Sequence, residues 1–207
     1  VVLPHLQGSL SAGLDEVSWV ITSYLAANAV VIPATGWLAG LFGRKRFFLL
    51  CCTVFTVSSF LSGIAPDLNT LIIARIFQGI GGGPIIPLSQ AILWEIFPFH
   101  QRGLAMAVWG LGFILGPILG PTVGGYLADE LSWRWIFYIN LPVGILGFTL
   151  ASAFLFDPPY LRRHARIDWW GLGLMILGFG CLQLVLDRGE REEWFDSGTI
   201  VAMAIIA

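Results

Sequence analysis

Six long intervals of this chain carry no charged residue, and they constrain its fold more than any other feature. The intervals are residues 17–43, 47–66, 76–94, 103–128, 135–156 and 169–186. A bilayer core about 30 Å thick is crossed by an α-helix of about 20 apolar residues. Charged residues make up 12% of the chain, whereas a soluble domain usually carries about 25%. The sequence therefore predicts an all-α polytopic membrane protein, because helices satisfy every backbone hydrogen bond within lipid.

The charges between these intervals predict the orientation of the helices. Residues 5–16, 65–70, 129–134 and 187–196, which we call the acidic end, hold three basic and ten acidic residues. Residues 43–46, 95–102 and 157–168, the basic end, hold seven basic residues. Basic loops favour the cytoplasm, so we expect the basic end there. Residues 1–4 are typical of the end of one span and 197–207 of the start of another, which predicts a fragment of a larger protein.

Residues 103–128 carry glycines at four-residue spacing, interrupted by two prolines. The glycines are Gly112, Gly116, Gly120 and Gly124, and the prolines are Pro117 and Pro121. Residues four apart share one helix face, so these glycines form a bare stripe that lets a second helix approach closely. The stripe predicts a tight helix contact within the membrane.

Arg75 is the one charged residue inside a predicted span, about 12 Å along the helix from Asp67. An arginine at this depth is costly unless it faces a partner or a wet cavity. Either the side chain reaches back to the outer interface, or it faces inward together with Gln78. The following segment, residues 79–87, is rich in glycine and proline, and we expect it to pack or kink rather than to bind phosphate.

Sequence motifs of enzymes are absent from the chain. It has no phosphate loop, no zinc-protease motif and no serine-hydrolase elbow. Three cysteines fall within spans without metal-ligand spacing. We therefore expect no catalysis, no metal, no cofactor and no nucleic-acid partner.

Four motifs in order resemble the major facilitator superfamily, and more narrowly its fourteen-span drug:proton antiporters of the EmrB/QacA type. The loop motif after the first complete span is matched by Gly36, Leu38, Gly43, Arg44 and Lys45. The span-four motif is matched by Arg75, Gln78, Gly79 and Gly81. The antiporter motif of span five is matched by Gly112, Gly116, Pro117, Gly120, Pro121, Gly124 and Gly125. A further motif, at the start of span six, is matched by Trp133, Arg134, Asn140 and Pro142.

The resemblance implies a domain organisation. Residues 1–156 would form the N-terminal bundle of 3+3 inverted repeats, 157–168 a cytoplasmic loop, and 169–207 extra linker spans. The C-terminal bundle and the proton-linked aspartate of span one would lie outside the chain. One departure is Gly40, which stands where the loop motif usually has an acidic residue, so we expect no charge relay through that position.

The resemblance also implies a mechanism. Proton-coupled efflux of amphipathic compounds across the cytoplasmic membrane would proceed by alternating access, with the proton gradient as the energy source and no cofactor. Arg75 and Gln78 would face the central cavity, the basic loop would latch the cytoplasmic side, and the glycine stripe would seal against the second bundle. Tyr24 and Asn28 are weaker cavity candidates, with lipid-facing or helix-contact roles as alternatives.

We expect four residues near the acidic end to have structural roles. We expect Trp133 and Trp135 to anchor at the outer membrane interface, and Arg134 and Asn140 to satisfy local backbone groups. The partners implied are membrane lipid and small amphipathic substrates. EmrB-like pumps also use a periplasmic adaptor and an outer-membrane channel, whereas QacA-like relatives work alone.

Three other functions stay open at this point. The chain could belong to an exporter of one specific metabolite or siderophore, because such exporters share these motifs. It could also be a non-transporting membrane scaffold subunit, although that function gives no reason to keep Arg75. An ATP-driven permease would need its nucleotide site on a separate chain.

Overall fold

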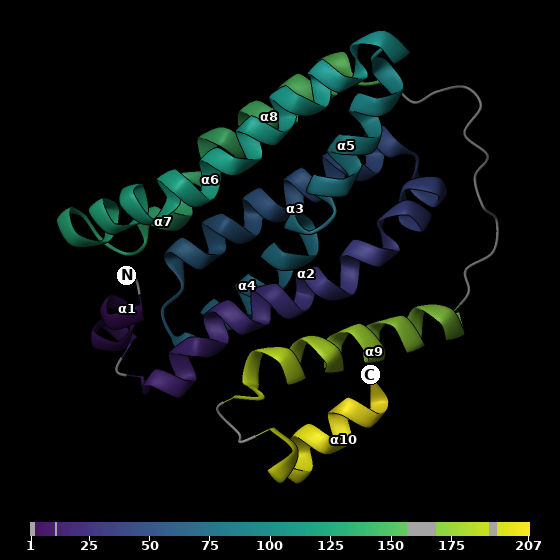
Figure 1. Ribbon diagram of the computed structural model, residues 1–207. Helices are drawn as coiled ribbons and strands as arrows, with labels where there is room; N and C mark the ends of the chain where they lie inside the picture. Colours follow the sequence, from purple (N-terminus) through teal and green to yellow (C-terminus); the bar gives the residue numbers. More distant parts are fainter. Residues whose placement is uncertain (1–2, 11, 157–168, 191–193) are drawn as a thin grey trace.

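The computed structural model describes residues 3–10, 12–156, 169–190 and 194–207. Within these ranges all regular structure is helical, which confirms the predicted all-α class (Figure 1). The α-helices are α1 (Leu3–Leu10), α2 (Leu14–Phe42), α3 (Arg44–Ile64), α4 (Leu68–Gly82), α5 (Ile85–Ile96), α6 (Arg102–Glu130), α7 (Trp135–Tyr138), α8 (Asn140–Phe154), α9 (Trp169–Arg188) and α10 (Gly198–Ile206). Short 3-10 turns occupy Phe99–Gln101 and Trp194–Asp196.

Six segments of the described chain are long and apolar enough to cross a membrane. They are Asp15–Phe42, Arg44–Ile64, Leu68–Ile96, Phe99–Glu130, Trp135–Phe154 and Trp170–Arg188. The predicted spans are confirmed, and their limits differ most at the start of the third span. The third interval was bounded at residue 76 by Arg75, whereas the helix starts at Leu68 because it accommodates that charge.

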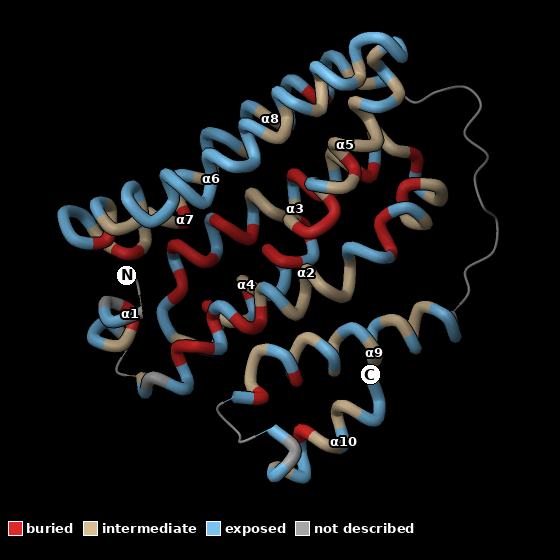
Figure 2. The backbone as a smooth tube through the Cα atoms, in the orientation of Figure 1, coloured by how far each residue is buried: buried red, intermediate tan, exposed pale blue. Residues whose placement is uncertain are grey.

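Helices α2, α3 and α4 pack most closely and form the core, and α8 packs on the far side of α3. Figure 2 shows buried residues gathered along these three helices, while α6 is largely exposed. Glycines permit the close approach. A Cβ atom on Gly79 would lie 2.6 Å from the Tyr24 carbonyl oxygen, and one on Gly81 would lie 2.6 Å from the Phe55 backbone nitrogen.

The same glycine-rich segment breaks the third span into two helices. Helix α4 ends at Gly82 and α5 begins at Ile85. Pro84 and Pro87 have no N–H to donate to the preceding turn, so the ladder of helical hydrogen bonds is interrupted here. Both expectations for this segment, packing and kinking, are confirmed.

Helix α6 stays continuous through Pro117 and Pro121. Cβ atoms built on the stripe glycines, Gly112, Gly116, Gly120 and Gly124, would meet nothing within 4 Å among the described residues. A hollow of about 480 Å³ lies between α6 and the α7–α8 segment, lined in part by Gly116, Gly120 and Asn140. The helix partner expected for the stripe stays a prediction.

Helix α9 runs along α2 at one side of the bundle, and α10 packs against α9 (Figure 1). The predicted cytoplasmic loop, residues 157–168, lies outside the described residues. The division of the chain into a bundle and extra spans stays a prediction.

Asp67 caps the first turn of α4. Its carboxylate accepts a hydrogen bond from the Thr70 backbone N–H at 2.8 Å and from the Thr70 hydroxyl at 2.9 Å. These two bonds hold the pKa of Asp67 below its ordinary value of 3.8. The folded state therefore favours the ionised carboxyl group.

We expect Asp67→Ala to lower the unfolding temperature at pH 7, because α4 loses its cap. Since the folded-state pKa is lowered, this stabilisation is present above the ordinary pKa and is lost as the pH falls through the folded-state value. The gap in unfolding temperature between wild type and variant should narrow from pH 7 to pH 3. Thermal unfolding in detergent tests this, with the exposed neighbour Asn69→Ala as control; an equal gap at both pH values would contradict it.

Candidate functional site

Arg75 points into the bundle, between α4 and α2. Its Nε donates to the Val20 carbonyl oxygen at 3.0 Å, and its guanidinium lies 4.0 Å from the centre of the Tyr24 ring. A cation over an aromatic face is attracted by the ring quadrupole, and the attraction grows where water is excluded. The side chain therefore does not reach back to the outer interface.

Gln78 connects Arg75 to a third helix, α3. Arg75 Nη1 donates to Gln78 Oε1 at 2.6 Å, and Gln78 Nε2 donates to the Ser59 hydroxyl of α3 at 2.5 Å. Gln78 is 1% exposed. Because both ends of the amide are bonded, Gln78 fixes the guanidinium in place and ties α2, α4 and α3 together at one depth.

Tyr24 and Asn28 lie one turn apart on the side of α2 that faces α4. The Tyr24 hydroxyl would be 3.2 Å from a Cβ on Gly82, and Asn28 Oδ1 would be 2.8 Å from one on Gly83. Asn28 Oδ1 is buried and accepts no hydrogen bond from the described residues. The structure thus brings Tyr24, Arg75 and Gln78 into one connected cluster and puts Asn28 beside the α4–α5 break.

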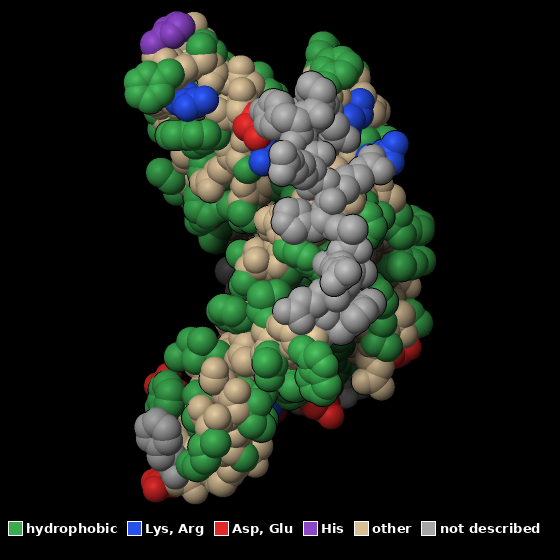
Figure 3. All heavy atoms as spheres, turned by 90° about the vertical axis from the view of Figure 1, so that its right-hand side faces the viewer, with side chains coloured by type: hydrophobic (Ala, Val, Ile, Leu, Met, Phe, Trp, Pro, Cys, Tyr) green, Lys and Arg blue, Asp and Glu red, His purple; other side chains and the backbone are tan. Residues whose placement is uncertain are grey.

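The loop motif lies at the basic end, where α2 meets α3 at one residue. Gly43 has φ 88°, a conformation that glycine adopts without strain, and it both ends α2 and starts α3. Leu38 packs against the cluster of Ala39, Phe47, Cys51 and Leu88. A Cβ on Gly36 would meet nothing within 4 Å among the described residues. Figure 3 looks onto this end, with Lys and Arg side chains over its upper half.

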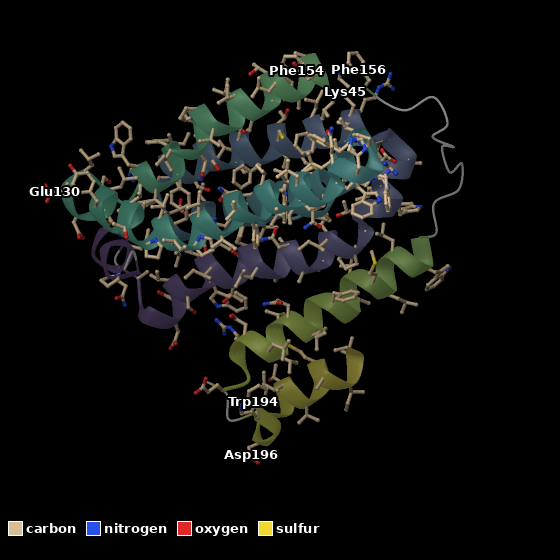
Figure 4. All side chains as sticks on the ribbon, turned by 45° about the horizontal axis from the view of Figure 1, so that its top comes forward. Lys45, Glu130, Phe154, Phe156, Trp194 and Asp196 are labelled. Carbon is tan, nitrogen blue, oxygen red and sulfur yellow. The ribbon has the colours of Figure 1, made fainter. Side chains whose placement is uncertain are left out.

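The two cations of the loop motif bind different partners. Arg44 forms an ion pair with Glu95 at the end of α5. Lys45 Nζ donates to the Ser152 carbonyl oxygen at 2.7 Å and lies 5.4 Å from the centre of the Phe156 ring (Figure 4). A cation on the last turn of α8 is favoured by the helix dipole. The loop motif therefore links α3 to α5 and α8.

Sequence reasoning missed Glu95 as the partner of Arg44. The available signal was an acidic residue among the cations of the basic end. A one-dimensional pattern does not say which of several nearby arginines such a carboxylate meets, because the ion pair joins residues that are far apart along the chain.

We expect Arg44→Glu to lower the thermal unfolding midpoint, and Arg44→Glu with Glu95→Arg to recover it. The single change opposes two carboxylates between α3 and α5, whereas the exchange restores an ion pair. Thermal unfolding in detergent measures this. The exposed Arg46→Glu is the control, since it makes the same charge change at the same end; no recovery in the exchanged pair would contradict the prediction.

The span-six motif holds α7 against α3 at the acidic end. Arg134 Nη1 donates to the carbonyl oxygens of Gly63 at 2.8 Å and Ala65 at 3.1 Å, and so caps the end of α3. Asn140 begins α8, and Pro142 follows in its first turn, where a missing N–H costs nothing. The motif therefore joins the end of α3 to the segment that leads into α8.

One expectation for this motif is wrong. Trp133 is 4% exposed and packs in a core cluster with Leu6, Val17 and Leu71, so it does not anchor at a lipid interface. Its indole is inside because α1, α2 and α4 converge over α7. Trp135 is 49% exposed, and its anchoring at the membrane interface stays a prediction.

The described residues contain no group of three or more His, Cys, Asp or Glu side chains that could hold a metal ion. The cluster around Arg75 consists of an arginine, an amide and hydroxyls. Such groups bind and orient a ligand or a water molecule through hydrogen bonds.

Comparison with known proteins identifies the family. The model of the Major Facilitator Superfamily matches residues 1–168. The multidrug export protein EmrB of Haemophilus influenzae is 44% identical over 207 residues, which is 100% of this chain and 41% of that protein. EmrB of Escherichia coli K12 is 41% identical over 100% of this chain and 40% of its own length. The fatty acid resistance protein FarB of Neisseria gonorrhoeae is 41% identical over 100% of this chain and 41% of its own length.

A solved structure shares the fold. The crystal structure of a D-xylose-proton symporter superposes with a TM-score of 0.66 at 18% sequence identity, covering 99% of this chain and 59% of that one. The chain spans about two fifths of the length of the curated relatives that it matches. With six apolar spans and these relatives, the chain is part of a multi-pass inner-membrane protein and belongs to the major facilitator superfamily.

Proposed function

We propose that the full-length protein exports amphipathic compounds across the cytoplasmic membrane in exchange for protons. The observation that carries this proposal is the cluster of Arg75, Gln78 and Tyr24, a positive charge held within an apolar bundle by three helices. Its support is the sequence identity of 44% and 41%, over the whole chain, to relatives named for multidrug export. The protein is then a transporter rather than an enzyme, and it needs no cofactor beyond the proton gradient.

Arg75 acts as a fixed charge in this mechanism. A guanidinium stays protonated under all physiological conditions, so it does not carry the transported proton itself. It attracts the anionic form of a nearby carboxyl group and so favours release of that group's proton. Gln78 and Tyr24 hold the charge at one depth while the two halves of the transporter rock around it.

Asn28 is the proposed contact to the substrate or to water. Its buried oxygen accepts no hydrogen bond from the described residues, and an unsatisfied buried acceptor is costly. A donor on a bound compound, or a water molecule, would satisfy it. Lipid around the spans completes the environment of the protein.

The second candidate is export of a narrow class of anionic amphiphiles. The relative FarB, named for fatty acid resistance, favours it, as does the positive charge of Arg75, which complements a carboxylate. For either candidate, a periplasmic adaptor and an outer-membrane channel are the proposed partners if the protein works as a three-part exporter.

Efflux and susceptibility profiling of the full-length gene in a pump-deficient host tests the proposal. We expect resistance to several unrelated amphipathic compounds, and loss of efflux when the proton gradient is dissipated. Resistance confined to fatty acids would favour the second candidate. Unchanged susceptibility to every compound, with the protein present in the membrane, would refute both.

A further inference from the structure

Helix α9 contacts α2 through polar and charged side chains near the acidic end. The Thr22 hydroxyl donates a hydrogen bond to the carboxylate of Asp187. One turn earlier on α2, the Trp19 ring lies 3.7 Å from the guanidinium carbon of Arg188. Two neighbouring residues at the end of α9 therefore contact two residues on one face of α2.

The depth of this contact makes it informative. Thr22 is 3% exposed and lies about 10 Å along α2 from Asp15, where the span begins. A carboxylate in the last turn of a helix is opposed by the helix dipole, so Asp187 does not serve α9 itself. Its hydrogen bond to Thr22 is the compensation that the structure provides.

The contact lies opposite the Arg75 cluster. Val20 and Thr22 are two residues apart, so they point about 200° apart around α2. Arg75 of α4 holds the Val20 carbonyl and the Tyr24 ring from one side. Asp187 and Arg188 hold Thr22 and Trp19 from the other side, at the same depth.

Towards the basic end the same two helices diverge. A hollow of about 310 Å³ separates them there, lined by Pro33, Ala34 and Trp37 of α2 and by Gly171, Leu172 and Met175 of α9. Near the acidic end, Trp194 folds back on α9, with its backbone N–H donating to the Gly189 carbonyl oxygen at 2.7 Å. The hydrogen bond of Asp187 and the cation–ring contact of Arg188 with α2 thus both lie at the acidic end.

We propose that Asp187 is a positioning residue, which clamps α9 to α2. It thereby holds in place the α2 segment that contacts Arg75 through Val20 and Tyr24. This role rests on the proposed efflux function. It makes the extra span a working part of the transporter bundle rather than a passive connection between two bundles.

A double-mutant cycle in the full-length protein tests the clamp. Thr22→Val and Asp187→Leu should each lower the thermal unfolding midpoint, and the double variant should fall no further than Asp187→Leu alone, because each change removes the same hydrogen bond. Thr53→Val is the matched control, since the Thr53 hydroxyl bonds only within α3 at Leu49; its effect should add to that of Asp187→Leu. Additive effects of Thr22→Val and Asp187→Leu would overturn the proposal.

Transport measurements test the positioning role. Asp187→Leu should reduce the initial efflux rate about tenfold, whereas Asp187→Asn, which keeps an acceptor for Thr22, should retain most of it. Glu190→Leu, an exposed change just beyond α9, should leave the rate unchanged. Wild-type efflux in Asp187→Leu, or equal loss in Asp187→Asn, would overturn the positioning role. A wild-type protein that exports nothing would refute the efflux proposal instead, while the thermal cycle still decides on the clamp.

Discussion

Arg75→Ala is expected to reduce efflux by the full-length protein at least about tenfold, and Arg75→Lys is expected not to restore it. The guanidinium bonds Val20 and Gln78 through different nitrogens and stacks on Tyr24. A lysine ammonium is a single point charge and does not reproduce this set of contacts. Loss of the arginine also leaves Gln78 Oε1 buried without its donor, at a cost of about 1–3 kcal/mol.

Arg102 provides a matched control for this prediction. It also bonds a backbone carbonyl, that of Phe97 at 3.2 Å, and lies 5.0 Å from the Trp94 ring, but it does so at the basic end. Initial efflux rates of a fluorescent amphipathic compound, at matched membrane expression, compare Arg75→Ala with Arg102→Ala. Equal loss in the two variants would mean that the Arg75 effect is not specific to the site inside the bundle.

Gly81→Ala is expected to destabilise the bundle strongly. Its Cβ would lie 2.6 Å from the Phe55 backbone nitrogen and 2.9 Å from the Cys51 carbonyl oxygen, and neither atom belongs to a flexible side chain. Helix α4 would have to move away from α3, and overpacking of this kind costs about 1–3 kcal/mol. The thermal unfolding midpoint in detergent measures this loss.

Gly116→Ala is the control, because a Cβ there meets nothing within 4 Å in the described part of the chain. We expect a wild-type unfolding midpoint for this variant. The larger change Gly116→Leu should also insert and fold, but it should abolish efflux or leak protons in the full-length protein if the stripe seals against another helix. A wild-type midpoint for Gly81→Ala would contradict the packing of α4 on α3 described above.

The sequence predicted the spans and the glycine contacts of α4 because both depend on local composition. Intervals free of charge set the helix positions, and glycine at 79 and 81 leaves room for backbone atoms of neighbouring helices. The same reasoning placed Trp133 at a lipid interface. Aromatic residues near a span end occur both in lipid and in the core, and only the convergence of α1, α2 and α4 over α7 decides between them.

The partners of the site residues depend on tertiary contacts and were harder to predict. Gln78 was expected beside Arg75 because three residues separate them on one helix, but Ser59 and Val20 come from other helices. No partner was predicted for Glu95 or for Asp187. Their partners Arg44 and Thr22 lie far from them in sequence, so no periodic pattern connects them.

Transport by the purified full-length protein in proteoliposomes, driven by an imposed pH gradient, tests the central claim most directly. We predict that the gradient drives movement of an amphipathic compound against its concentration, that dissipating the gradient stops it, and that Arg75→Ala abolishes it while Arg102→Ala does not. Gradient-driven transport at the wild-type rate in Arg75→Ala would contradict the role of the charge held within the bundle.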